Sequence, residues 1–384
     1  MNILILAPHL VLPARNGADL LVERNARALS GLGHEVTVLS ASGHLTYHDG
    51  TISNAVDLGL HMRRRSVAGL RTLAFRSNFF KEKFLTPAWC TAARQLLANA
   101  SWSHIVCSYI VTATLVTEET RPVAIWTHND EFKWFSTLAN AAGNPLGRMA
   151  AEASGRWTES WLKKHARQFL YVHVTETDRE GFHARVPDMN SLVQPIGTDI
   201  PDEPAPPVVP GTTRLELLFV GSLGVTMNGD ALRHFATHFW PVISTAFGTD
   251  IGVTIAGSHP SDAVVNLCRA RGWTLQANIS DDALQSLYNR SSFTMLPFPY
   301  ATGAKLKMLG SLAHGVPFLA TSALHAQQSM AAAPCLLSDN ADDWVEALRH
   351  LRQDGLDFRT RHALQTRVHS HSWPSVAREL TDAL

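Results

Sequence analysis

The stretch Asn2–Ala41, NILILAPHLVLPARNGADLLVERNARALSGLGHEVTVLSA, decides the fold class. The run NILILAP is apolar and ends at a proline, which is typical of a strand buried on both faces. The segment that starts at Gly17 has the apolar spacing of a helix, Gly33 stops it, and EVTVLSA is typical of a second strand. A strand, a helix and a strand at this spacing predict a βαβ unit with two parallel strands.

The same alternation of strand and helix recurs along the chain. The sequence predicts strands at 103–108, 123–129 and 169–176, with helices at 85–100 and 155–170. Six prolines between Pro195 and Pro210 then mark a linker. Beyond the linker the sequence predicts strands at 215–222, 250–258, 273–278 and 293–298, with helices at 229–247, 260–272 and 280–291.

These segments describe two α/β halves joined by a proline-rich link. In parallel sheets of this kind, ligands bind beyond the carboxyl ends of the strands, and two such halves also create a cleft between domains. The last segment, WPSVARELTDAL (373–384), is predicted to form one terminal helix. Functional residues are therefore expected in the loops that follow strands.

Composition limits the class of protein. The 384 residues are 45% hydrophobic and 17% charged with no net charge, which is ordinary for a globular protein and gives no overall attraction to nucleic acid. The four cysteines show no CxxC spacing, so a disulfide scaffold and a cysteine zinc site are not expected. The start lacks a basic leader and no run of roughly 18 apolar residues occurs, so we expect a cytoplasmic protein without a transmembrane helix.

Two loops contain the small residues that let a phosphate group approach the backbone. Gly17 leads into the first helix, and a helix N-terminus favours an anion. In the second half, Gly221 and Ser222 follow a strand and can offer backbone amides and a hydroxyl to a phosphate. Asn228 or Asp230 is expected to cap the helix that comes next. The alternative interpretation of both loops is an ordinary strand–helix connection.

The segment TGAKLKMLGSLAHGVP (302–317) places two lysines at the start of a helix. Gly303 and Ala304 precede the predicted helix, so Lys305 and Lys307 lie in its first turn. The helix macrodipole is positive at that end and disfavours each cation by roughly a few tenths of a kcal/mol unless an anion joins them. A bound diphosphate explains the glycine and the two charges together. The alternative is a pair of lysines that extend into water.

Two further segments have functional interpretations. His128, in IWTHNDEF (125–132), follows a strand directly and can exchange a proton or hydrogen-bond a substrate hydroxyl. Its neighbours lack HExxH spacing, so a metal site is not expected there. Residues Arg63–Lys83 interleave basic and large apolar side chains, which suits an anionic membrane surface but also an ordinary solvated helix.

Together these motifs resemble those of GT-B glycosyltransferases, specifically glycosyltransferase family 4 of the group 1 type. The segment 17–40 resembles the family's glycine loop and first helix, THNDEF its histidine segment, and QPIGTDI the end of its first domain. FVGSLGVTMNGDALRHF and LPFPYATGAKLKMLGSLAHGVPFLATS resemble the opening of the donor domain and the loop and helix that hold the nucleotide sugar. The similarity spans nearly the whole chain, and the order and spacing of the motifs carry it.

The resemblance implies a fold. The expected class is α/β, with two Rossmann-like parallel-sheet domains that face an interdomain cleft. Residues 1–200 would form the N-terminal acceptor-side domain, with a linker to about 213, and residues 214–365 the nucleotide-sugar-binding domain. Residues 366–384 would form a terminal helix that crosses back to the first domain.

The resemblance also implies an activity. It predicts a hexosyltransferase-type enzyme (EC 2.4) that moves a sugar from a nucleotide diphosphate donor to an acceptor hydroxyl, with retention at the anomeric carbon. The expected acceptor is a glycan, a lipid-linked sugar or a protein, in bacterial cell-envelope or exopolysaccharide assembly. Neither a cofactor, a metal nor a nucleic-acid partner is expected. A cytoplasmic protein with peripheral contact to the inner face of the membrane through Arg63–Lys83 is expected.

Positions that match the family's motifs receive roles from the resemblance. Lys305 and Lys307 would stabilise the leaving diphosphate, and His128 would contact the transferred sugar. Gly17 matches the glycine on the phosphate side. The predicted site therefore has the catalytic residues His128, Lys305 and Lys307 and the donor-binding residues Gly17, Gly221, Ser222, Gly303 and Ala304.

The sequence departs from the family pattern at two places. Gly310 stands where the family commonly has a glutamate that holds the ribose hydroxyls, and VGSLGVTMN lacks the arginine–lysine pair of many members. Two alternatives follow. The chain would be a binding or scaffold protein that kept the fold and lost transfer, or a GT-B epimerase that uses carboxylates in the cleft to act on the sugar nucleotide itself.

Overall fold

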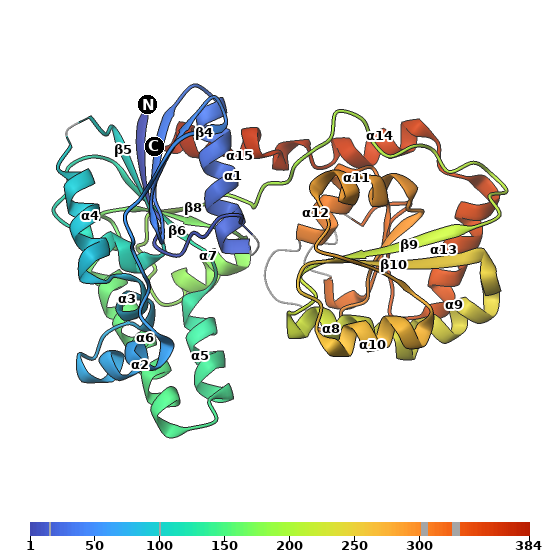
Figure 1. Ribbon diagram of the computed structural model, residues 1–384, viewed down its shortest axis with the longest axis horizontal. Helices are drawn as coiled ribbons and strands as arrows, with labels where there is room; N and C mark the ends of the chain where they lie inside the picture. Colours follow the sequence, from blue (N-terminus) through green and yellow to red (C-terminus); the bar gives the residue numbers. More distant parts are fainter. Residues whose placement is uncertain (15–16, 100, 301–305, 325–330) are drawn as a thin grey trace. The chain divides into compact units, whose positions relative to one another are not determined.

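The structure is a computed structural model, and it describes residues 1–14, 17–99, 101–300, 306–324 and 331–384. The chain divides into two compact units (Figure 1): Met1–Gly197 with Trp373–Leu384, called unit 1, and Thr198–Ser372, called unit 2. Each unit has a mostly parallel sheet covered by helices. The predicted α/β class with two Rossmann-like sheets is therefore confirmed.

The elements of unit 1 follow one another along the chain as expected for an α/β fold. Its strands are β1 (Asn2–Leu6), β2 (Glu35–Leu39), β3 (Gly43–His48), β4 (Thr51–Asp57), β5 (His104–Ser108), β6 (Val123–Thr127), β7 (Leu170–His173) and β8 (Ser191–Val193). Its helices are α1 (Gly17–Gly31), α2 (Arg65–Ala74), α3 (Phe79–Phe84), α4 (Pro87–Leu97), the 3-10 helix η1 (Ile110–Leu115), α5 (Glu131–Ala141), α6 (Pro145–His165), α7 (Glu176–His183) and α15 (Trp373–Ala383).

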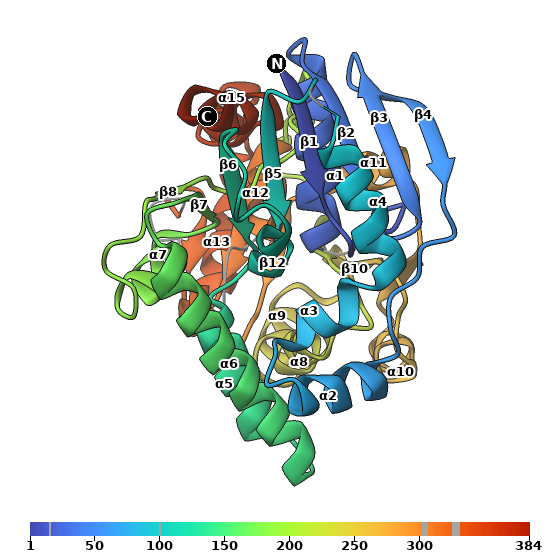
Figure 2. The same cartoon turned by 90° about the vertical axis from the view of Figure 1, so that its left-hand side faces the viewer.

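The sheet of unit 1 is built outward from the first strand. Within the described residues its order is β4-β3-β2-β1-β5-β6-β7-β8, and all pairs from β2 to β8 are parallel. Strand β1 is completely buried from Ile3 to Leu6, because helices cover both faces of the sheet (Figure 2). The βαβ unit predicted from Asn2–Ala41 is confirmed. The chain leaves β1 toward β2 on one side and returns to β5 on the other.

An antiparallel hairpin, β3–β4, extends one edge of this sheet and was not expected from the sequence. Its two-residue turn consists of Asp49 and Gly50, which have φ angles of 47° and 73°. Two positive φ angles are the signature of the type I′ turn that Asp-Gly favours. The Asp-Gly pair was therefore the available signal. Most of β4 is exposed, so it shows no strong hydrophobic pattern.

Unit 2 has a simpler sheet. Its strands are β9 (Leu215–Val220), β10 (Ile251–Gly257), β11 (Thr274–Ala277), β12 (Phe293–Leu296), β13 (Phe318–Ala320) and β14 (Leu336–Leu337). Its helices are α8 (Thr226–His234), the π-helix η2 (Phe235–Phe239), α9 (Trp240–Phe247), the 3-10 helix η3 (Gly248–Asp250), α10 (Asp262–Arg271), α11 (Asp281–Arg290), α12 (Leu306–Ala313), α13 (Ala341–Asp354), α14 (Phe358–Thr366) and the 3-10 helix η5 (His369–His371).

The strand order of unit 2 fixes where a ligand can bind. Among the described residues the order is β11-β10-β9-β12-β13-β14, and every pair is parallel. From β9 to β11, successive strands are added toward one edge of the sheet. From β12 to β14 they are added toward the opposite edge, so the strand order reverses between β9 and β12. In open parallel sheets the carboxyl ends at such a reversal form the ligand crevice.

The helix predicted at 229–247 is interrupted. Helices α8 and α9 are joined by the π-helical segment Phe235–Phe239. Pro241 follows at the start of α9, and because proline has no backbone N–H, the hydrogen bonds before it shift to the wider π pattern. The remaining predicted helices and strands of this unit occur close to their predicted positions.

The terminal helix α15 belongs to unit 1. Gln194 links it to the sheet, since its amide nitrogen donates to the carbonyl of Val376 (2.8 Å) and its amide oxygen accepts from the indole of Trp126 (3.0 Å). Gly197 lies against the ring of Trp373, and a side chain at this position would overlap that ring. Unit 1 therefore contains residues from both ends of the chain.

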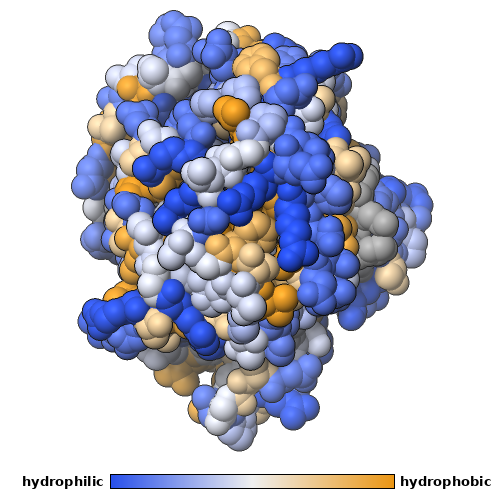
Figure 3. Space-filling view, turned by 90° about the vertical axis from the view of Figure 1, so that its right-hand side faces the viewer, coloured by the Kyte–Doolittle hydropathy of each residue, from blue (hydrophilic) through white to orange (hydrophobic). Residues whose placement is uncertain are grey.

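One face of the molecule is mostly hydrophilic, with hydrophobic residues scattered over it (Figure 3). Among the described helices, none combines the length and hydrophobicity needed to cross a bilayer.

We predict that Gly257→Ala destabilises unit 2 by about 3 kcal/mol or more, because a Cβ at this position would overlap the carbonyl oxygen of Gly221. Urea unfolding monitored by tryptophan fluorescence measures the change. Gly229→Ala in α8 is the matched control, since its Cβ would meet only ordinary contacts at 3.6 and 3.9 Å. The control is expected to be neutral or stabilising by up to about 1 kcal/mol. Equal stabilities of the two variants would contradict the close approach of β9 and β10 at their ends.

Candidate functional site

A cluster of polar side chains lies at the carboxyl edge of unit 1. Three adjacent strands, β1, β5 and β6, deliver His9, Ser108 and His128 to this edge. Ser108 is the last residue of β5, and His128 follows β6 directly. Because parallel strands end on the same side of the sheet, residues far apart in sequence meet here.

These side chains form one continuous chain of hydrogen bonds. Asp19 Oδ1, in the first turn of α1, lies 3.0 Å from His9 Nδ1. His9 Nε2 lies 2.7 Å from the hydroxyl oxygen of Ser108, and the same oxygen lies 2.7 Å from His128 Nε2. Asp19, His9 and Ser108 are buried, whereas His128 retains some exposure. The chain of bonds therefore runs from the interior to a partly exposed imidazole.

Tyr109 packs over both imidazoles in a strained backbone conformation. Its φ angle is 72°, in the region that non-glycine residues avoid at a cost of roughly 1–3 kcal/mol. Its ring lies 4.7 Å from that of His9, nearly perpendicular, and 4.3 Å from that of His128. Its backbone N–H donates to the carbonyl of Trp126 (3.1 Å). The unusual backbone conformation of Tyr109 thus places its aromatic ring against both imidazole rings.

Burial controls the protonation of this site. Desolvation, assisted by the nearby His9, lowers the pKa of His128 well below its usual value, so its imidazole is neutral near pH 7. Glu131, the first residue of α5, is 3% exposed, and neither carboxyl oxygen has a hydrogen-bond partner among the described residues. Burial raises the pKa of Glu131 to about 8. Its carboxyl group is therefore mostly protonated at neutral pH.

A cavity opens beside the hydrogen-bonded chain. It has a volume of about 400 Å³ and is lined by His9, Asp19 and Tyr109 together with Lys83, Phe84, Met62, Val11, Pro13 and Ala18. Gly17 is the first residue of α1 and directly precedes the lining residues Ala18 and Asp19 in the sequence. No atom lies within 4 Å of the position that a Cβ on Gly17 would take. Space for a ligand is thus available next to the glycine predicted to admit one.

In unit 2, the structure brings two predicted site residues together at the β9/β12 reversal. Gly221 follows β9, and Lys307 is the second residue of α12. A Cβ built on Gly221 would lie 2.8 Å from the Cε of Lys307. The ammonium group of Lys307 lies 5.3 Å from the ring centroid of Phe298, which follows β12. A side chain at 221 would therefore displace the end of the Lys307 side chain from this position.

The neighbouring helix α8 begins without a side-chain cap. Its N-cap residue is Val225, so the expected capping by Asn228 or Asp230 is wrong. Asn228 instead donates from Nδ2 to the carbonyl of Ser222 (2.7 Å), and its buried Oδ1 has no hydrogen-bond partner in the described part of the chain. Asp230 pairs with Arg233 and accepts from the hydroxyl of Tyr300. An uncapped N-terminus beside a glycine loop favours an anion.

Gly310 is explained by its packing. A Cβ at this position would lie 3.2 Å from the hydroxyl oxygen of Tyr288. The Tyr288 ring stacks on His314 at 3.9 Å, and His314 Nδ1 donates to the carbonyl of Gly310 (2.7 Å). The space beside α12 is therefore filled by an aromatic pair, which leaves little room for a longer side chain at 310.

Part of unit 2 matches a known protein family. Residues 214–354 match the family model described as Glycosyl transferases group 1. A comparison with curated protein sequences gives no match. Among solved structures, the sucrose-phosphate synthase of Thermosynechococcus elongatus is similar with a TM-score of 0.64 and 15% identity, over 100% of this chain and 98% of that chain.

Two other solved structures give the same result. The E. coli trehalose-6-phosphate protein bound with UDP-2-fluoro glucose has a TM-score of 0.61 and 12% identity, over 99% of this chain and 98% of that chain. A glycosyltransferase from Rickettsia africae has a TM-score of 0.60 and 11% identity, over 100% and 97%. The chain therefore has the fold of GT-B glycosyltransferases, and its residues 214–354 match the group 1 family. The resemblance inferred from the motifs is thereby confirmed for the fold and for this segment.

The structure describes some of the site residues predicted from the sequence and not others. Gly221, Ser222 and Lys307 lie together in unit 2, and Gly17 and His128 lie at the carboxyl edge of unit 1. Gly303, Ala304 and Lys305 lie outside the described residues.

Sequence reasoning missed several residues of the polar cluster in unit 1, among them His9, Asp19 and Ser108. The available signal was that His9 and Ser108 come at or just after strand ends, as His128 does.

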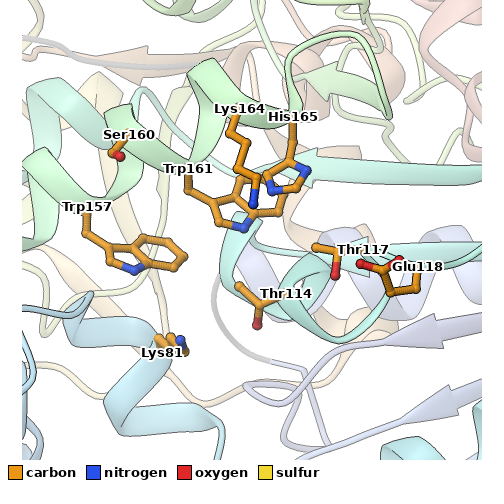
Figure 4. Close-up of a pocket in the computed structure, with 9 residues that line it drawn as sticks. All are labelled: Lys81, Thr114, Thr117, Glu118, Trp157, Ser160, Trp161, Lys164 and His165. Atoms are coloured by element: carbon orange, nitrogen blue, oxygen red, sulfur yellow. The ribbon is translucent and has the colours of Figure 1, made fainter.

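A separate cavity of about 390 Å³ lies in unit 1 against α6 (Figure 4). Trp157 and Trp161 form part of its wall with nearly parallel rings 6.3 Å apart, and the ammonium group of Lys81 lies 5.4 Å from the Trp157 ring. None of the predicted site residues lines this cavity. The described residues also contain no group of three or more His, Cys, Asp or Glu side chains placed to bind a metal ion.

We predict that Glu131→Gln removes a pH dependence from the stability of the protein. Because the pKa of Glu131 is raised to about 8, the folded state keeps a proton that the unfolded state releases above its ordinary pKa of 4.5. The free energy of unfolding should therefore fall as the pH rises through this window, by about 1.4 kcal/mol per pH unit. Urea unfolding of both proteins at about pH 5, 6 and 7 measures the difference.

The variant should gain stability relative to the wild type as the pH increases. Glu118→Gln, at an exposed position in the same unit, is the control and should follow the wild type at each pH. Parallel curves for wild type and Glu131→Gln would show that this carboxyl group is not held protonated.

Proposed function

We propose that the protein is a retaining glycosyltransferase that moves a sugar, of the hexosyl class, from a nucleotide diphosphate donor to an acceptor hydroxyl. One observation carries the proposal: Lys307 lies against Gly221 at the β9/β12 reversal, inside the segment that matches the group 1 family. This is the position in a parallel sheet where nucleotides bind.

Unit 2 supplies the groups that a diphosphate needs. The ammonium of Lys307 and the uncapped N-terminus of α8 are positive. The backbone N–H of Gly221 already donates to the carbonyl of Ala256 (3.0 Å), so the proposal assigns the phosphate to the lysine and to the first N–H groups of α8 rather than to this amide. Departure of the diphosphate builds negative charge, and cations already in place lower that barrier. The proposal gives this neutralising role to Lys307, helped by Lys305 and the Gly303–Ala304 loop, and assigns no metal ion or cofactor to it.

Unit 1 supplies the group that contacts the sugar. We assign this role to His128, which is neutral near pH 7 and partly exposed at the carboxyl edge of the sheet. Gly17 lies at the start of α1 with open space beside it, which suits close approach of the donor. The strained Tyr109 fixes the orientation of the imidazole. Strain at an active site is commonly part of its preorganisation.

A second candidate function is a binding or scaffold protein with the same fold. The packing of Tyr288 beside Gly310 favours it, because the glutamate that commonly holds the ribose is replaced and its space is occupied. Such a protein would bind no nucleotide diphosphate, or bind it without turnover. The two functions are separated by the measurements that follow.

We predict that Lys307→Ala weakens nucleoside diphosphate binding by roughly 10- to 100-fold, the usual cost of one charged hydrogen bond. Calorimetric titration with UDP, GDP and ADP measures it. Gly221→Ala should weaken binding as well, although it removes no charge, since its Cβ would displace the Lys307 side chain. Arg269→Ala, on the exposed surface of α10, is the charge-matched control and should bind as the wild type does.

Turnover is measured with a panel of nucleotide sugars, with release of the nucleoside diphosphate as the readout. Lys305→Ala with Lys307→Ala should abolish turnover, and a metal chelator should leave the wild type unchanged. Product stereochemistry determined by NMR should show retention. Unchanged turnover in the double variant would exclude the assigned role, and binding without turnover by the wild type would favour the scaffold.

We further propose that unit 1 contacts an anionic membrane through α2. This helix buries Ala68 and Thr72 and exposes Val67 (44%) and Leu70 (62%), followed by Phe75 (62%). Its apolar stripe therefore faces solvent, the reverse of an ordinary surface helix. Helix α2 packs against α6, whose first turns expose Leu146 and Met149 as well.

The charges around this stripe are only partly available to a membrane. Arg71 pairs with Glu82 (2.8 Å), and Arg63 donates to the carbonyl of Leu85 (3.2 Å). Arg64, Arg65 and Arg76 are exposed and form no ion pair with the described residues. Exposed apolar side chains between arginines fit anionic headgroups above an acyl layer. A lipid-linked acceptor in envelope or exopolysaccharide assembly is consistent with such a contact.

We predict that Leu70→Gln with Phe75→Gln lowers binding to vesicles of phosphatidylglycerol and phosphatidylcholine by roughly tenfold or more, because two apolar anchors are lost. Cosedimentation measures the bound fraction. Val209→Gln with Phe358→Gln changes two exposed apolar residues of unit 2 and should leave binding unchanged. Vesicles of phosphatidylcholine alone should bind weakly. Equal binding of both variants, or no binding by the wild type, would rule out α2 as the contact.

A further inference from the structure

The cavity against α6 lies away from the carboxyl edge of unit 1. Thr117 and Glu118, which line it, come a few residues before β6, and His165, also in its wall, comes a few residues before β7. The cavity is therefore near the amino ends of these strands, whereas His128 follows the carboxyl end of β6. Its volume of about 390 Å³ falls within the roughly 300–1,000 Å³ of small-molecule sites. Unit 1 thus has a second place where a ligand can bind.

Two tryptophans form an aromatic wall of this cavity (Figure 4). Trp157 and Trp161 are four residues apart on α6, so both indoles lie on the same face of the helix, and their planes differ by 14°. Trp161 is held by the nearly parallel ring of Phe169 at 5.9 Å and by the ring of His165 at 4.6 Å. Both tryptophans are only partly buried, although this residue is highly buried on average. A rigid aromatic surface is therefore accessible from the cavity.

The polar groups around the two indoles are mostly hydrogen-bond donors. Within the described residues, neither indole N–H has a hydrogen-bond partner, and the hydroxyls of Thr117 and Ser160 in the same wall have none either. A sugar ring has the complementary chemistry. Its C–H groups form an apolar face that packs on an indole, and its oxygens accept hydrogen bonds from N–H and O–H groups.

Two lysines add positive charge to the wall. The ammonium group of Lys81 lies 5.4 Å from the Trp157 ring centroid, and the Lys164 side chain is exposed. Neither lysine forms an ion pair within the described part of the chain. Figure 4 shows the acidic lining residue Glu118 on the far side of the cavity from Trp157 and Lys81. An anionic group is thus attracted to the tryptophan side, while Glu118 can accept from hydroxyl groups on the other.

We propose that this cavity is a binding site for an acidic glycan. A sugar ring packs on Trp157 and Trp161, and its carboxylate or phosphate lies toward Lys81, with Lys164 contributing positive charge. The proposal goes beyond the transfer reaction, because binding here requires neither a nucleotide sugar nor turnover. It also differs from the proposed membrane contact, which uses the exposed apolar residues of α2.

Calorimetric titration of the full chain, without a donor, tests the ligand class. The acidic probes are tetrasaccharides of galacturonate, mannuronate and hyaluronate. Maltotetraose is the neutral sugar, and citrate is an anion without a sugar ring. At least one acidic tetrasaccharide should bind roughly tenfold or more tightly than either comparison compound, since only it has both the ring and the charge. No binding of any acidic probe, or equal binding of maltotetraose or citrate, would overturn the proposal.

Two variants locate the bound probe. Trp157→Ala should weaken binding roughly tenfold or more through loss of the stacking surface. Lys81→Gln with Lys164→Gln should weaken it by a similar factor, and more at low salt than at high salt. Lys133→Gln with Lys163→Gln removes the same charge from exposed positions outside the cavity wall and should bind as the wild type does.

Unchanged affinity in both cavity variants would place the glycan elsewhere and overturn the proposal. If Trp157→Ala does not fold, the lysine pair decides alone, because replacing two partly exposed or exposed lysines by glutamine leaves the aromatic wall intact.

Two further measurements separate this site from the other proposals. Helix α2 packs against α6, so Trp157→Ala is also tested by cosedimentation with the phosphatidylglycerol vesicles and should bind them as the wild type does. Loss of vesicle binding without loss of glycan binding would assign Trp157 to the membrane and overturn the proposal. Titration of Trp157→Ala with UDP should match the wild type, since the site assigned to the diphosphate is in unit 2. Loss of UDP binding in this variant would show a nucleotide on the tryptophans instead of a glycan.

Discussion

Parallel strand pairing places the loops after neighbouring strands at one edge of each sheet, and the candidate sites depend on this constraint. In unit 2 the reversal between β9 and β12 brings Gly221 and Lys307 into contact, although they are far apart in sequence. In unit 1 the strand order turns at β1 and β5, and His9 meets Ser108 there. The sheets thus supply the geometry, and the residues just beyond the strand ends supply the chemistry.

The carboxyl edges of the two sheets also carry groups that lower the stability of the folded protein. Tyr109 has a positive φ angle, and the carboxyl of Glu131 is buried without a hydrogen-bond partner among the described residues. In unit 2, Asn228 has an unpartnered buried oxygen in the described structure, and α8 begins without a side-chain cap. Each feature costs stability on its own. Their location at strand ends suggests that the rest of each unit compensates for a site prepared to receive a ligand.

Much of the fold was readable from the sequence, because buried parallel strands such as Ile3–Leu6 are continuous apolar runs and the helices between them have clear ends. The hairpin β3–β4 was missed because β4 is mostly exposed and its pattern is weak. The link between His9 and Ser108 spans 99 residues and has no local motif, so only the folded sheet reveals it. Likewise, the conformation of Tyr109 follows from tertiary packing that no local pattern encodes.

The central claim is that the positive groups at the β9/β12 reversal receive a diphosphate. A crystal structure of the protein grown with a nucleoside diphosphate tests it most directly. The account predicts phosphate oxygens within hydrogen-bond distance of the Lys307 ammonium and of the first backbone N–H groups of α8. A nucleotide bound elsewhere in the protein, with Lys307 directed away from its phosphates, would contradict the account.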